Sequence, residues 1–280
     1  MAQLSPTGQT IQLCDGRILG YAEYGNADGK PVLYFHGHPG SRLEPGFLSG
    51  QAAQTGIRLI SIDRPGMGLS TYQTGRRLLD WPDDVQELVD HLHLDRFAIL
   101  GFSGGGPYAL ACAYKIPQRL TVCGIAAGVG NVSPLLELLS TWLPWLFLPL
   151  SRRMFQNQEQ AEKSLKRFMR AWVPADRQAF SVPGVSKAIA SSLVEALRPG
   201  ARGAAYDGTV LGRRNLGFLL ENIEFPEIYT WHGELDNQIP VTSARDLVKH
   251  IPHHQSTYYP NEGHISLIVN RAEEIFNTLI

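Results

Sequence analysis

The most informative stretch of the chain spans residues 97–110 and reads Phe-Ala-Ile-Leu-Gly-Phe-Ser-Gly-Gly-Gly-Pro-Tyr-Ala-Leu. Its first four residues are apolar, which predicts a buried strand. Small and apolar residues then continue to Ala113, and this second part fits a helix that ends before Pro117. Between the two parts, Gly101 to Gly105 matches G-x-S-x-G, a pattern in which a serine occupies a sharp strand-to-helix turn. The stretch therefore predicts that Ser103 stands above the edge of a sheet, with its hydroxyl as a candidate nucleophile.

The backbone of this turn also matters for the chemistry. Gly101 and Gly105 lack a Cβ atom, so the strand and the helix can approach each other closely. The N–H of Gly104 lies at the predicted helix start and is a candidate donor to a developing oxyanion. A short glycine-rich pattern can also be only a turn. The prediction of catalysis therefore depends on partners elsewhere in the chain.

Composition narrows the class of protein. The chain has 280 residues, of which 44% are hydrophobic and 18% charged, enough for one large α/β domain with an insertion. A formal net charge of −1 without a long basic run argues against a nucleic-acid partner. The three cysteines lack metal-type spacing, and the first residues do not form a signal-peptide pattern. The longest apolar run, Trp142 to Leu150, is too short to span a bilayer. We expect a cytoplasmic protein without a membrane span.

The order of the other elements predicts the fold class. Four further apolar segments predict buried strands, and they are Pro31–Phe35, Ile57–Ile62, Thr121–Ala127 and Glu227–Trp231. They alternate with helical patterns, which favours a mostly parallel central sheet flanked by helices. An Asp15-Gly16 turn inside residues 11–24 predicts a β-hairpin ahead of them.

The strand pattern disappears between residues 129 and 223. Four segments there have a helix-compatible composition, and they are Pro134–Leu150, Gln158–Trp172, Val185–Leu197 and Gly203–Leu211. We interpret residues 129–223 as a helical cap inserted into a core that consists of residues 1–128 and 224–280.

A serine hydroxyl needs a base, and the base needs an orienting acid. In this architecture the three residues follow the order serine, acid, histidine. Asp236 follows the predicted strand Glu227–Trp231 and so lies at the same sheet edge as Ser103, where open α/β sheets build their sites. Glu234, two residues earlier, is the rival acid.

The base is sought among four later histidines, His250, His253, His254 and His264. The first three lie at or just after the end of a predicted helix, Ser243–His250, and are interpreted as solvated residues of that end. His264 follows the predicted strand Ser256–Tyr259 and would reach the edge that carries Ser103.

The second oxyanion donor is expected from the loop after the strand Pro31–Phe35. The backbone N–H of His38 is the candidate. The side chains of His36 and His38 are interpreted as structural or pocket-lining, because the third position of the triad is already filled.

Five segments in this order resemble the α/β-hydrolase superfamily over nearly the whole chain. They are the turn His36–Gly40, the loop Asp63–Ser70, the elbow Gly101–Gly105, the segment His232–Asp236 and the pair Gly263-His264. The resemblance is to serine hydrolases with a helical cap, such as esterases and proline iminopeptidase-like enzymes. It implies Ser103 as nucleophile, His264 as base and Asp236 as orienting acid.

Two departures refine this resemblance. The turn His36 to Ser41 is also similar to that of epoxide hydrolases and haloalkane dehalogenases, which use an aspartate at the elbow. Ser103 stands there instead, and water does not readily cleave an alkyl–serine ether, so both reactions are disfavoured. Proline iminopeptidase-like enzymes usually carry tryptophan after the serine, whereas this chain has Gly104, which puts aminopeptidase activity in doubt.

The sequence predicts a hydrolase of small-molecule carboxylic esters, or of related amides, thioesters or lactones, with an acyl-serine intermediate and without a metal or cofactor. The apolar segment Leu143–Leu148 fits a partly apolar substrate, and it fits packing of the cap on the core equally well. Two alternatives stay open: a ligand receptor of the same fold, and a non-hydrolytic lyase that uses the same triad. The sequence leaves the natural substrate and the oligomeric state open.

Overall fold

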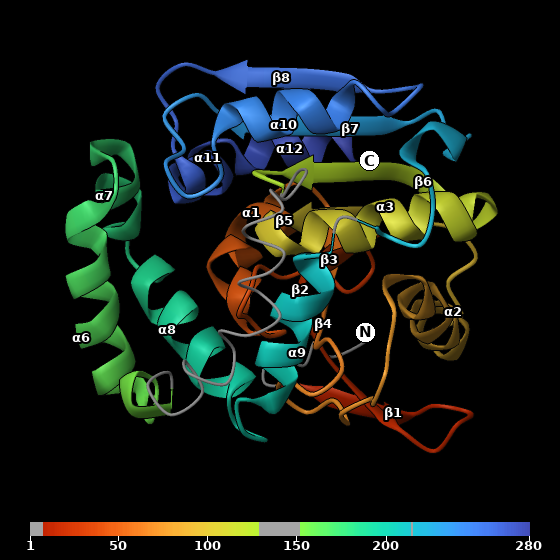
Figure 1. Cartoon of the computed structure of the whole chain (residues 1–280), viewed down its shortest axis with the longest axis horizontal. Coiled ribbons are helices and arrows are strands. Elements are labelled where there is room, and N and C mark those ends of the chain that lie inside the picture. The colour runs from red at the N-terminus through yellow and green to blue at the C-terminus, as the bar shows by residue number, and fades with distance from the viewer. Residues whose placement is uncertain (1–7, 129–151, 214) are drawn as a thin grey trace.

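A computed structural model describes residues 8–128, 152–213 and 215–280 (Figure 1). Its central sheet has eight strands in the order β1-β2-β4-β3-β5-β6-β7-β8. The strands are β1 (Gln9–Gln12), β2 (Ile18–Gly25), β3 (Lys30–Phe35), β4 (Ile57–Ile62), β5 (Phe97–Phe102), β6 (Leu120–Ala126), β7 (Ile228–Gly233) and β8 (Gln255–Tyr259). The pairs β1–β2 and β2–β4 are antiparallel and all other pairs are parallel. The predicted mostly parallel sheet and the N-terminal hairpin are both confirmed.

The middle strands are buried on both faces, which explains their continuous apolar sequences. In β3, Val32 and Tyr34 pack into one apolar cluster, while Leu33 and Phe35 pack into the other. Helices α1 (Ser49–Gln54) and α12 (Ala272–Thr278) contribute to the first cluster, and α2 (Trp81–His91), α3 (Gly106–Lys115) and α10 (Val241–Val248) contribute to the second. The sheet is therefore the middle layer between two layers of helices (Figure 1).

Helices occupy the described part of the segment between β6 and β7. They are α6 (Gln158–Phe168), α7 (Pro174–Phe180), α8 (Val185–Ala196) and α9 (Arg202–Leu211). The predicted helices match α6, α8 and α9 closely, except that α6 ends at Phe168 and a 3₁₀ turn, Met169–Ala171, follows it. Helix α7 was not predicted, because seven residues are too few for a periodic pattern. The predicted helix over Pro134–Leu150 lies outside the described residues.

Helices α6, α7 and α8 lie together at the left of Figure 1, whereas α9 lies closer to the centre of the view. Helix α7 packs against α11 (His264–Asn270), and α8 packs against the 3₁₀ turn Glu44–Leu48. The helical segment therefore touches the core next to the loops that leave β3 and β8. The division into a core and a 129–223 cap stays a prediction.

Parallel strands place their carboxyl ends at one edge of the sheet. The loops after β3, β5, β7 and β8 therefore meet there, although they begin far apart in the sequence. In the three described ranges no helix is both long enough and apolar enough to cross a bilayer.

Candidate active site

The elbow places Ser103 in a strained backbone conformation. Strand β5 extends through Phe102, two residues beyond the predicted apolar run, and Ser103 then has a φ angle of +51°. Non-glycine residues seldom adopt this region, and such strain concentrates at functional sites. The flanking glycines permit the turn, because a Cβ at Gly101 would lie 2.6 Å from the carbonyl oxygen of Gly105. A Cβ at Gly105 would lie 2.0 Å from the carbonyl oxygen of Phe35.

The structure brings the predicted base and acid together. His264 Nδ1 lies 2.7 Å from Asp236 Oδ2, and both residues are buried. The other carboxylate oxygen, Oδ1, accepts the backbone N–H groups of Gln238 and Ile239 at 2.9 and 2.8 Å. Burial is the largest single influence and raises the pKa of this carboxyl. The hydrogen bond and electrostatic effect of His264, the backbone N–H of Ile239 and the nearby His232 together outweigh burial, so the pKa of Asp236 is lowered. An ionised Asp236 therefore holds the proton of His264 on Nδ1.

His264 lies beside the elbow. Its ring is tilted by 47° against the ring of Phe102, with 5.2 Å between centroids. Among the described residues no hydrogen bond joins Ser103 Oγ to His264 Nε2. Such contacts are often long in unliganded enzymes and tighten when substrate binds.

The rival acid and the other histidines lie elsewhere. Glu234 is on the surface and pairs with Arg245 at 2.5 Å. His250 is also exposed and pairs with Glu221 at 2.7 Å. His253 and His254 are exposed at the same end of the core. Among the described residues, Asp236 and His264 are the only candidate acid and candidate base that form a hydrogen bond with each other.

A further histidine, which sequence reasoning did not single out, supports the acid. His232 is buried, and its Nε2 donates to the carbonyl oxygen of Ile239 at 2.9 Å. The same nitrogen lies 3.4 Å from Asp236 Oδ2. Burial lowers the pKa of His232, so its ring is neutral near pH 7. Its place in the segment His232–Asp236 was the available signal.

The predicted oxyanion donors are adjacent. A Cβ at Gly104 would lie 3.3 Å from the backbone nitrogen of His38 and 2.8 Å from its Cβ. A hydrogen bond fixes the loop that contains Gly37 and His38: the N–H of Gly37 donates to the buried carboxylate of Glu44 at 2.8 Å. Burial raises the pKa of Glu44, although this N–H and the hydroxyl of Tyr34 oppose the shift.

His36 has the structural role expected for it. Its Nδ1 donates to the carbonyl oxygen of Gly37 at 2.8 Å, and its Nε2 accepts the backbone N–H of Arg64 at 3.3 Å. Complete burial and the nearby charge of Arg64 hold the pKa of His36 well below its usual value. A neutral ring is the form that can both donate and accept here.

Two buried carboxylates from helices between β6 and β7 reach this site, and sequence reasoning missed both. Asp176 of α7 accepts the backbone N–H groups of His264, Ile265 and Ser266 at 3.0, 2.9 and 2.9 Å. It thereby caps the helix that begins with the predicted base. Gly263 makes room for it, since a Cβ there would lie 2.5 Å from the carboxylate.

The second of these carboxylates is Asp207 of α9, which is fully buried. It accepts hydrogen bonds from four side chains, those of His38, Arg64, Arg76 and Tyr108. Burial alone would raise its pKa, but the two guanidinium groups hold the pKa of Asp207 well below its usual range. In the sequence, Asp207 could have been recognised only as an aspartate among the small residues of α9.

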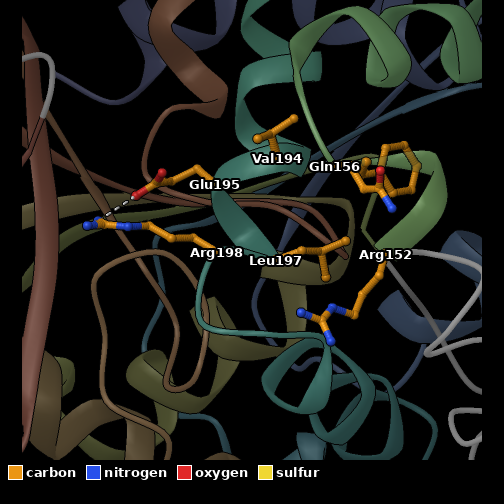
Figure 2. A pocket seen from close by; sticks show the side chains of 7 residues that line it. Arg152, Gln156, Val194, Glu195, Leu197 and Arg198 are labelled. Carbon is orange, nitrogen blue, oxygen red and sulfur yellow. Dashed lines mark hydrogen bonds and ion pairs between the residues drawn. The ribbon is translucent and has the colours of Figure 1, made fainter.

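A cavity of about 570 Å³ lies apart from these residues. Figure 2 shows its lining side chains, which include Arg152, Val194, Leu197 and Arg198, and none belongs to the predicted triad. Within the described ranges, no group of three or more metal-ligating side chains forms a cluster.

Comparison with known proteins identifies the family. A profile of the alpha/beta hydrolase fold matches residues 30–271. The chain belongs to this family, which confirms the fold and the α/β-hydrolase family predicted from the sequence.

The individual relatives share between 20% and 33% sequence identity with this chain. A proline iminopeptidase-like protein of Leptolyngbya boryana is 33% identical over 102 residues, which is 35% of this chain and 32% of that protein. This match thus spans about a third of the relative's length. A proline iminopeptidase-like protein of Mycoplasma genitalium is 26% identical over 300 residues, with 96% of both chains covered. An esterase from Exiguobacterium antarcticum has the same fold, with a TM-score of 0.72, 20% identity and 98% of both chains covered.

Proposed function

We propose that the protein is a serine hydrolase of small-molecule carboxylic esters, with related amides, thioesters and lactones as further substrates. One observation carries this proposal. A buried Asp236–His264 pair lies at the same sheet edge as Ser103, whose φ angle is +51°. The similarity to an esterase and to proline iminopeptidase-like proteins agrees with a hydrolysed acyl bond.

In the proposed acylation, His264 acts as general base. Asp236 holds the Nδ1 proton, so Nε2 carries the lone pair that accepts the proton of the Ser103 hydroxyl. The serine oxygen then bonds to the substrate carbonyl carbon, and the carbonyl oxygen becomes an oxyanion. The N–H groups of Gly104 and His38 are the proposed donors to it. Collapse of the intermediate expels the alcohol, which takes the proton from Nε2.

In the proposed deacylation, water replaces the alcohol. His264 accepts a proton from the water as its oxygen attacks the acyl–serine carbonyl. The second tetrahedral intermediate releases the carboxylic acid, and Ser103 regains its proton from His264. Each proton that His264 accepts is passed on, and no atom changes oxidation state, so the cycle needs no external oxidant or reductant.

Fluorophosphonate labelling followed by ester turnover tests the proposal. Wild-type protein should be labelled and should hydrolyse p-nitrophenyl acetate or butyrate, whereas Ser103→Ala should lose both. Loss of the nucleophile in comparable triads costs roughly a millionfold in kcat. Ser256→Ala is a matched control, because Ser256 lies on β8 and its hydroxyl bonds to Thr230 at 2.8 Å.

The outcomes separate the competing functions. Full labelling of Ser103→Ala would exclude the assigned nucleophile. Labelling of the wild type without turnover of any ester, lactone or proline p-nitroanilide would favour the receptor alternative instead.

A further inference from the structure

The peptide unit between Gly37 and His38 connects the oxyanion site to the cap. Its N–H belongs to His38 and is a proposed oxyanion donor. Its carbonyl oxygen, on Gly37, accepts hydrogen bonds from Arg64 Nη2 at 2.9 Å and from His36 Nδ1 at 2.8 Å. Because a peptide unit is planar and its N–H and C=O point in opposite directions, holding the carbonyl also sets the direction of the N–H.

Arg64 contacts both this loop and the cap. Its side chain is completely buried, and its Nη1 donates to the carbonyl oxygen of His36. Its Nη2 donates to Gly37 on one side and to Asp207 Oδ2 on the other, the latter at 2.8 Å. The planar guanidinium has its five N–H donors in a fixed geometry, so these contacts define one orientation of the loop.

Asp207 also contacts this loop directly, in addition to its contact through Arg64. Its Oδ2 accepts the Nδ1–H of His38 at 2.9 Å, so the cap helix α9 contacts the side chain of the residue whose backbone is the proposed donor. A flipped Gly37–His38 peptide would turn its N–H toward Arg64. Two donors would then face each other in a buried site, at the cost of the unsatisfied groups.

We propose that Arg64 and Asp207 are positioning residues for the oxyanion hole, an inference that rests on the proposed serine-hydrolase function. Asp207 orients Arg64, and Arg64 keeps the His38 N–H directed toward the oxyanion. The positive charge on the carbonyl side also polarises the peptide and makes its N–H a stronger donor. The cap therefore takes part in transition-state stabilisation as well as covering the core.

The chain offers a matched pair of variants, Arg64→Lys and Arg76→Lys. Both arginines are buried and both donate to Asp207. Arg76 also donates to the hydroxyl of Tyr108 and lies over the ring of Tyr206 at 5.9 Å from its centroid. It makes no hydrogen bond to residues 36–38 within the described structure. Both substitutions should lower the melting temperature, but only Arg64→Lys should affect the oxyanion hole.

The readouts are kcat and KM with a p-nitrophenyl ester and the Ki of butylboronic acid, which forms a tetrahedral adduct with an active serine. Loss of a whole oxyanion donor costs about 10²–10³ in kcat, so Arg64→Lys, which keeps the N–H, should cost about 10- to 100-fold. The Ki of butylboronic acid should rise by the same factor, with KM nearly unchanged. In Arg76→Lys both kcat and Ki should stay within about threefold of wild type.

Several outcomes would overturn the inference. Equal losses of kcat in the two lysine variants would do so, as would a loss in Arg64→Lys without weaker boronate binding. If Arg64→Lys does not fold, Asp207→Asn tests the inference in its place. It should lower kcat about tenfold and weaken the binding of butylboronic acid about tenfold. An unchanged Ki for butylboronic acid would refute the inference. Failure of wild type to bind butylboronic acid or to react with fluorophosphonate would instead refute the serine-hydrolase function itself.

Discussion

Replacement of Asp236 by asparagine should reverse the hydrogen-bond role of His264. In the structure Oδ1 of Asp236 accepts two backbone N–H groups, from Gln238 and Ile239, and Oδ2 accepts the Nδ1–H of His264. The amide of an asparagine has one acceptor and one donor end. The two backbone donors retain its oxygen, so its NH₂ group faces His264.

This arrangement favours the wrong tautomer of the base. His264 then accepts at Nδ1 and carries its proton on Nε2, where it cannot take the proton of Ser103. The alternative amide orientation would set the NH₂ group against the part-buried N–H groups of Gln238 and Ile239 and lose both hydrogen bonds, each worth about 0.5–1.5 kcal/mol. Asp236→Asn should therefore lower kcat by about four orders of magnitude, or roughly 5 kcal/mol of activation free energy.

The assay is steady-state hydrolysis of a p-nitrophenyl ester, with thermal melting as the check on folding. Glu234→Gln is the matched control, because Glu234 is exposed and its described ion pair is with Arg245. It should leave kcat within about twofold. A folded Asp236→Asn that keeps more than about a tenth of the wild-type kcat would refute this account of the pair, and a larger loss in Glu234→Gln would transfer the role to that residue.

Three further changes test the surrounding structure. Gly105→Ala places a Cβ 2.0 Å from a backbone carbonyl oxygen of β3 and should cost more than about 3 kcal/mol of unfolding free energy. Gly50→Ala is the control, because a Cβ there has nothing within 4 Å and should not destabilise the protein. Equal effects of the two substitutions in urea denaturation would contradict this prediction. Because the pKa of His36 is held well below 6.5, unfolding takes up a proton below that pH, so stability should fall with acidification. His36→Asn should remove up to about 1.4 kcal/mol per pH unit from that slope between pH 6.5 and 5.5, and an unchanged slope would contradict the buried neutral ring. Asp176→Asn should lower kcat more than it raises KM, because it loosens the helix that begins at His264; loss of stability with unchanged kcat would leave Asp176 a purely structural role.

Local patterns were sufficient for most of the fold and for the predicted triad. Strands buried on both faces have continuous apolar sequences, and the elbow needs glycines at fixed offsets from Ser103. Chain order then places Asp236 and His264, because each follows a parallel strand whose carboxyl end lies at the same edge. The strand boundaries were less predictable, and β5 continues through Gly101 and Phe102 because its ladder to β6 extends through both.

The residues of α7 and α9 that reach the site could be found only from the tertiary structure. Asp207 contacts Arg64 across 143 residues, and Asp176 contacts His264 across 88. Neither aspartate belongs to a periodic pattern or a motif, and helix α7, which carries Asp176, is only seven residues long. A single buried charge leaves almost no trace in the sequence around it, because its compensating donors come from distant segments that packing brings together. The sequence therefore predicts which residues react, and the packing of helices α7 and α9 determines which carboxylates contact them.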